Sequence, residues 1–230
     1  MRFGGWVCII IKDVRYIKKP NSDHVPQEET EMRIAFTGPH RTGKTTLALY
    51  AKEVVEELTG VDHAHLSGVA KTAGTKLGAD MHELEELFRV LEVWLEAYNR
   101  SSCYVADRAM LDRAAYWITN CRLCGIVPPT HANFLERMAR LHADSLDVLY
   151  YVPTGIAFVE EEGKPNEQFQ QEVGMTFDWL WYRLLGPGPN RIIRAKTFVF
   201  SATDLEDRKA RVRERIQLAW NSMPGGRGTL

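Results

Sequence analysis

Apolar and polar residues follow two alternating patterns along the chain from residue 32 onward. Short apolar runs, typical of buried strands, are separated by longer stretches in which apolar residues recur every three or four positions, as on one face of a helix. The predicted strands are residues 33–37, 61–66, 103–106, 148–152 and 198–200. The predicted helices are residues 44–58, 71–77, a long segment from residue 80, and residues 109–123, 130–143, 166–185 and 204–220.

Strands that are separated by helices are typical of a parallel sheet, because consecutive parallel strands need a crossover connection. Such a sheet is covered by helices on both faces, which matches the continuous apolar runs of the predicted strands. We therefore predict an α/β fold with a five-stranded parallel sheet and helices on both faces.

The long helix that begins near residue 80 has one clearly apolar face. Asp80 and Glu83 form a start that resembles a capping box. The residues at helical spacing on its apolar face are Leu84, Leu87, Phe88, Leu91, Trp94, Leu95 and Tyr98.

The first 31 residues differ from the rest of the chain. A short apolar run at residues 6–11 is followed by a polar stretch, and at Met32 the sequence starts again with a compact strand. We predict an N-terminal extension over residues 1–31, upstream of an original start at Met32, with a genuine edge strand or arm as the alternative. One domain is expected over residues 32–222. A flexible, glycine-rich tail is expected over residues 223–230.

Composition excludes several classes of protein. The 230 residues are 45% hydrophobic, too apolar for a disordered chain, and the net charge of −1 provides no overall attraction to nucleic acid or membrane. The apolar runs are far shorter than the roughly 20 residues that a membrane span needs. The four cysteines form no disulfide pattern and no secretory signal is recognisable, so we expect a cytoplasmic protein. The oligomeric state is not predicted.

The segment between the first predicted strand and the next helix fits the phosphate-binding pattern G-x-x-x-x-G-K-[ST] at every fixed position. Its residues are Gly38, Pro39, His40, Arg41, Thr42, Gly43, Lys44 and Thr45, followed by Thr46. In such a loop the backbone N–H groups and the helix N-terminus bind phosphate oxygens. We expect Lys44 to contact the β- and γ-phosphates of ATP, and the Thr45 hydroxyl to ligate Mg²⁺.

The predicted strand at residues 103–106 is followed by Asp107 and Arg108. A motor-type ATPase usually has a glutamate after the aspartate to activate water, and here that position is a cation. The pair therefore favours a kinase. Asp107 would accept a hydroxyl proton or hold magnesium, and Arg108 would hold the acceptor or the transferring phosphoryl group. The alternative is a strand-end ion pair without a chemical role.

Residues 32–48 and 105–116 resemble the AAA-type P-loop kinase-like domains that are common in bacteriophages. These domains are similar to nicotinamide-riboside kinases and, more distantly, to thymidylate and deoxynucleoside kinases. The more specific part is the pattern D-R-x-x-x-D-x-x-x-Y, formed by Asp107, Arg108, Asp112 and Tyr116. The resemblance covers about residues 32–220 and implies the P-loop NTPase fold, with ATP as phosphoryl donor and Mg²⁺ as cofactor.

The resemblance also implies a short lid segment after the fourth strand. Members of the family often carry Asp-Gly-x-Arg there, and the arginine contacts the phosphates. This chain has Glu-Gly-Lys-Pro at residues 162–165, so Lys164 would take that part as a point charge rather than a planar fork. Arg183, in the predicted helix 166–185, is a second candidate for contact with the cleft.

Three functions fit these features. The first is a kinase of a nucleoside- or nucleotide-type acceptor. The second is a kinase of a hydroxymethylated pyrimidine, of the 5-hydroxymethyluracil type, within DNA. The third is a regulatory ATP-binding module, which the Asp-Arg pair disfavours. A run of basic residues near the C-terminus suits DNA, whereas the near-neutral net charge mildly favours the small acceptor. This run consists of Arg208, Lys209, Arg211, Arg213 and Arg215.

Overall fold

The computed structural model of the chain describes residues 32–67, 84–126, 129–155, 166–185, 197–201 and 203–223. Several predictions fall outside these ranges: the extension at residues 1–31, the helix at residues 71–77, the start of the long helix at residue 80, and the lid segment with Lys164. The predicted tail also falls outside them from residue 224 onward. Among the described helices, none combines the length and the apolar composition needed to cross a membrane.

The described residues form one five-stranded sheet in which all paired strands are parallel, in the order β2-β3-β1-β4-β5. The strands are β1 (Arg33–Thr37), β2 (Ala64–Leu66), β3 (Tyr104–Ala106), β4 (Val148–Tyr151) and β5 (Thr197–Val199). This confirms the predicted α/β fold. Because β3 and β4 lie on either side of β1, the segments that follow these three strands meet at one edge of the sheet.

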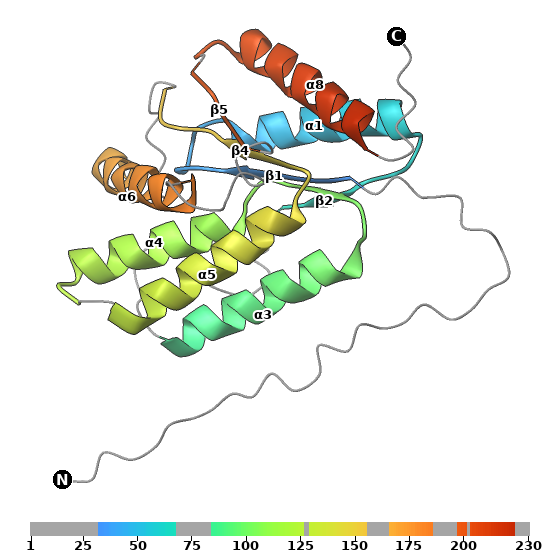
Figure 1. The fold of residues 1–230 in the computed structure, drawn as a ribbon. Coiled ribbons are helices and arrows are strands. Elements are labelled where there is room, and N and C mark those ends of the chain that lie inside the picture. Colours follow the sequence, from blue (N-terminus) through green and yellow to red (C-terminus); the bar gives the residue numbers. More distant parts are fainter. Residues whose placement is uncertain are drawn as a thin grey trace, which may run out of the picture.

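Helices cover both faces of the sheet (Figure 1). They are α1 (Lys44–Thr59), α3 (Leu84–Arg100), α4 (Met110–Leu123), α5 (Pro129–Ser145), α6 (Glu167–Leu185) and α8 (Leu205–Ser222). Side chains of β1 alternate between the two layers: Ile34 and Phe36 pack in the core with α1 and α8, and Ala35 packs in the core with α3 to α6. The middle of the strand, residues 34–36, is therefore apolar on both faces.

Four strands differ at their ends from the sequence prediction. β3 begins one residue later and β4 ends one residue earlier than predicted. β2 is shorter than residues 61–66, because α1 ends at Gly60 in a left-handed conformation and the next residues turn. The backbone N–H of His63 donates to the Glu56 carboxylate at 2.8 Å, which holds this turn against the end of α1. β5 begins and ends one residue earlier than predicted.

The predicted apolar face of α3 is confirmed in part. Leu91, Trp94 and Tyr98 are buried, whereas Leu95 is 40% exposed. Leu95 lies at the wall of a cavity next to the start of α4.

Candidate active site

The phosphate loop connects β1 to α1 at the carboxyl end of the sheet. Its backbone takes positive φ angles at Gly38 (144°), Arg41 (60°) and Gly43 (84°). Gly38 passes so close to the end of β4 that a Cβ there would overlap the carbonyl oxygen of Val152. This position therefore requires glycine. The N–H groups in the first turn of α1 have no carbonyl of the preceding turn to bind, and a helix N-terminus of this kind attracts anions.

The Lys44 ammonium lies inside the loop. It donates to the carbonyl oxygen of Pro39 and, at 3.2 Å, to the Thr42 hydroxyl. Burial, helped by the nearby charge of Arg108 and opposed by that of two aspartates, lowers the pKa of Lys44 to about 7. An anionic partner stabilises the charged form of an amine that is desolvated in this way. The phosphates expected to contact Lys44 would be such a partner.

Asp107 follows β3 and lies next to the first turn of α1. The Thr45 hydroxyl donates to Oδ2 of Asp107 at 3.0 Å, and both side chains are at least partly accessible to solvent. The structure thus brings together the two residues that the sequence suggested for magnesium. One hydroxyl and one carboxylate suit Mg²⁺, which usually takes its other ligands from phosphates and water. No cluster of three or more metal-ligating side chains occurs among the residues that the structure describes.

Asp112 links Arg108 to the strand that precedes the phosphate loop. Its carboxylate, which is 1% exposed, accepts hydrogen bonds from the Thr37 hydroxyl (2.7 Å), the Arg108 guanidinium (3.1 Å) and the backbone N–H of Ala109 (2.9 Å). A buried carboxylate with three donors is well compensated for its loss of water. The sequence contained Asp112 within the resembling pattern, but it gave no indication of this role.

Side chains from α3 and α5 hold the start of α4. The Tyr98 hydroxyl donates to the carbonyl oxygen of Arg108 at 2.9 Å, and the N–H of Met110 donates to Nδ1 of His142 at 3.4 Å. Nε2 of His142 lies 3.4 Å from the Tyr104 hydroxyl. Burial lowers the pKa of His142 to about 3, so the ring is neutral, with its proton on Nε2.

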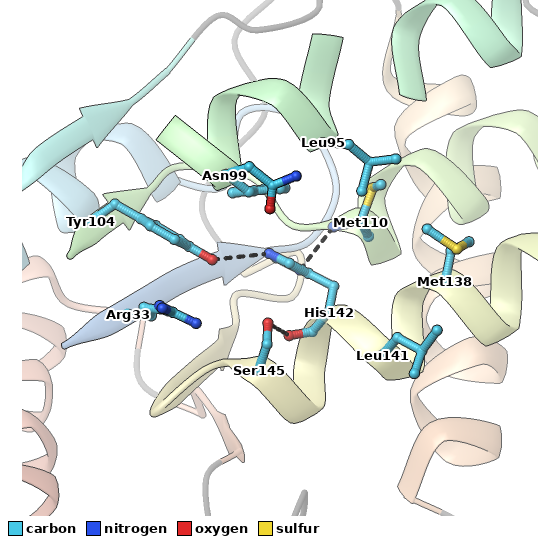
Figure 2. A pocket seen from close by; sticks show the side chains of 10 residues that line it. Arg33, Leu95, Asn99, Tyr104, Met110, Met138, Leu141, His142 and Ser145 are labelled. Atoms are coloured by element: carbon cyan, nitrogen blue, oxygen red, sulfur yellow. Dashed lines mark hydrogen bonds between the residues drawn. The ribbon is translucent and has the colours of Figure 1, made fainter. Parts of the chain in front are cut away.

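These side chains border a cavity of about 220 Å³ (Figure 2). Its walls come from β1, α3, β3, α4 and α5. Figure 2 shows His142 between Tyr104 and Met110, with dashed lines to both. Side chains of α3 and α5 therefore bind the backbone on either side of Ala109, while Asp112 of α4 binds the N–H of Ala109 itself.

The structure does not bring Arg183 to the phosphate loop. Arg183 pairs with Glu136 of α5 at 3.0 Å and stacks on Trp179. The loop contacts the other end of α6, where Gln170 donates to the carbonyl oxygen of His40 at 2.6 Å. Thirteen residues of helix, or about 20 Å, separate Gln170 from Arg183. The second lid candidate, Lys164, lies outside the described residues.

Most of the basic run in α8 makes contacts within the protein. Arg208 is 1% exposed and donates to the carbonyl oxygen of Thr42 at 2.9 Å, so it braces the phosphate loop. Arg213 pairs with Glu57 and Lys209 pairs with Glu206. Arg215 lies over the ring of Phe198. Most of this charge is thus engaged within the protein.

Comparison with known proteins identifies the fold but no family. No protein-family model matches the sequence, and no curated protein matches it in sequence. A solved structure of NadR protein in complex with NR matches with a TM-score of 0.54 at 14% identity, over 82% of this chain and 50% of that chain. The chain therefore spans about half the length of this NadR chain.

A second match is deoxyadenosine kinase from M. mycoides with bound dCTP. It has a TM-score of 0.50 at 14% identity, and it covers 81% of this chain and 100% of that chain. At such low identity the two matches show a shared fold and nothing about shared residues. The α/β fold of this chain is thus similar to that of these two proteins, one of which is a kinase by name.

Proposed function

We propose that this protein is an ATP-dependent kinase that transfers a phosphoryl group to a hydroxyl of a small nucleoside- or nucleotide-type acceptor. The observation that supports this proposal best is the hydrogen bond between Thr45 and Asp107, with the cation Arg108 as the next residue. The carboxylate of Asp107 lies beside the phosphate loop, and Arg108 occupies the position where an ATPase would have a second acid for activating water.

Each group then has a defined role. The loop N–H groups and Lys44 bind the phosphates, Thr45 would ligate magnesium, and Asp107 would hold the ion through water. Mg²⁺, when bound, neutralises charge on the phosphates. Asp107 accepts the proton of the acceptor hydroxyl as the new P–O bond forms, while Arg108 stabilises the negative charge of the transferring group.

The engagement of α8 favours a small acceptor over DNA. Binding to a polymer rests on several exposed cations that contact successive phosphates. Arg208 is buried against the loop, and Lys209 and Arg213 are in ion pairs, so α8 offers a polymer few cations. The names of the two structural matches, one in complex with NR and one a deoxyadenosine kinase, are consistent with a small acceptor.

Transfer from γ-labelled ATP distinguishes the three functions. The panel of acceptors contains nucleosides, nucleotides and DNA with 5-hydroxymethyluracil, each assayed with wild-type protein and with Lys44→Ala. We expect label in a nucleoside or nucleotide. Label only in the DNA would show that the acceptor is the polymer and not a small molecule. Absence of label in every acceptor, together with tight ATP binding, would favour the regulatory module.

A further inference from the structure

Tyr116 connects Arg108 to the phosphate loop. The Arg108 guanidinium lies over the Tyr116 ring, 5.3 Å from its centre. The Tyr116 hydroxyl lies 3.2 Å from Nδ1 of His40 in the loop. The ring of Tyr116 thus contacts Arg108 while its hydroxyl contacts the phosphate loop. Tyr116 is 5% exposed, which shields this chain of contacts from water.

Asp112 makes a parallel connection one helical turn earlier. It binds Arg108 and also accepts from Thr37, three residues before His40. Arg108 is therefore held by Asp112 and Tyr116, which lie four and eight positions further along. These two side chains in turn contact the two ends of residues 37–40. The guanidinium is fixed at two points relative to the segment that opens the phosphate loop.

We infer that Tyr116 is a positioning residue for Arg108, an inference that rests on the proposed kinase function. An arginine side chain loses much conformational entropy when it is ordered. In this protein Arg108 is already ordered by its contacts when the chain folds, so the entropy is not lost during phosphoryl transfer. Small displacements of a group that must meet the transferring phosphoryl reduce the rate strongly.

Packing alone does not account for the hydroxyl. The Tyr116 ring contacts Phe169 and Phe177, with ring centres 6.1 and 6.3 Å away, and phenylalanine would make the same contacts. Tyr116→Phe therefore removes the link to His40 and keeps the ring beneath Arg108. Tyr50→Phe is a matched control, because the Tyr50 hydroxyl accepts from Arg213 at 3.3 Å between α1 and α8, away from the reacting groups.

A double-mutant cycle tests the inference. We expect Tyr116→Phe to lower kcat about 5- to 10-fold, the equivalent of one hydrogen bond, with the KM for ATP changed less than about twofold. In an Arg108→Ala background the same change should alter kcat less than about twofold, because the residue that it positions is gone. Tyr50→Phe should have no effect on kcat. Equal losses in both backgrounds, or no loss in either, would overturn the inference.

A second measurement is independent of phosphoryl transfer. Solvent exchange of the Arg108 side-chain N–H protons, followed by NMR, should be faster in Tyr116→Phe than in the wild type and unchanged in Tyr50→Phe. If the wild-type protein phosphorylates no acceptor, the proposed function fails, and this measurement alone decides the positioning. Unchanged exchange in Tyr116→Phe would then exclude it.

Discussion

The hydroxyl of Thr45 and the carboxylate of Asp107 are 3.0 Å apart, although 62 positions separate them in the sequence. The contact follows from sheet order. Because β3 pairs with β1, the residue after β3 lies beside the helix that follows the phosphate loop. The carboxyl edge of a parallel sheet is where ligands bind in folds of this kind, so this pair marks the site where we expect the chemistry.

Replacement of Asp107 separates its two proposed roles. Asp107→Asn keeps the shape and the ability to accept from Thr45, but it removes charge and basicity. If Asp107 is the base, acceptor phosphorylation should fall by about 10²–10⁴-fold with little change in ATP affinity. If it mainly serves magnesium, ATP affinity should fall as well when Mg²⁺ is present. Both quantities are measured on the same variant, by product formation and by calorimetry.

The control for this variant is Asp62→Asn. Asp62 is a 93% exposed carboxylate in an ion pair with Lys52, remote in sequence from the loop. The Asp62→Asn variant should leave phosphoryl transfer unchanged. Normal phosphorylation by Asp107→Asn would remove Asp107 from the reaction and leave only the phosphate loop.

Lys44→Ala should abolish transfer without weakening the fold. The ammonium is buried, and burial disfavours its charged form, so its loss costs the folded state little or even stabilises it. Loss of a charge that meets the phosphates should reduce kcat by about 10²–10³-fold or more. Turnover and thermal unfolding are compared with those of Lys52→Ala on the same helix. Near-normal turnover would contradict the phosphate-loop mechanism.

Gly38→Ala tests the close approach of the loop to β4. A Cβ would overlap the Val152 carbonyl oxygen, and φ at this position is 144°, so the variant should lose about 3 kcal/mol or more in free energy of unfolding. Gly60→Ala is the matched control, because Gly60 also has a positive φ but no atom lies near its Cβ. It should lose only about 1 kcal/mol. Equal losses, measured by urea unfolding, would mean that backbone conformation alone accounts for the effect.

His142 predicts a loss of stability in acid. Its pKa is about 3 in the folded protein, below the roughly 6.5 of an unfolded chain, so between these pH values the unfolded state binds one more proton. The free energy of unfolding should therefore fall as the pH drops below about 6.5, by up to about 1.4 kcal/mol per pH unit from this residue. His142→Gln lacks the group and should show a shallower pH dependence in urea unfolding between pH 7.5 and 5. An equal pH dependence of the free energy of unfolding in the two proteins would contradict the low pKa of His142 in the folded state.

Local sequence patterns predicted the elements that form the site. β1 and the start of α1 match the prediction residue for residue, since a strand, a glycine loop and a helix start are all encoded within a dozen positions. These features depend on hydrophobic periodicity and on glycine, both of which are visible along the chain.

The supporting contacts were not predictable from such patterns. Arg208 binds the Thr42 carbonyl across 166 positions, and the sequence shows only a cation in a basic helix. The same holds for Tyr98 and His142, which bind backbone atoms of α4 and of the turn before it. Each of these roles depends on which helix packs beside which turn, and that is decided by tertiary packing.

The fate of the γ-phosphate in the wild-type protein tests the kinase proposal most directly. ADP, phosphorylated acceptor and inorganic phosphate are measured in one reaction with ATP, Mg²⁺ and the best nucleoside or nucleotide acceptor. The structure predicts one phosphorylated acceptor for each ADP and little inorganic phosphate, because Arg108 stands where a water-activating acid would be. ADP matched by inorganic phosphate, with no phosphorylated product from any acceptor, would contradict it.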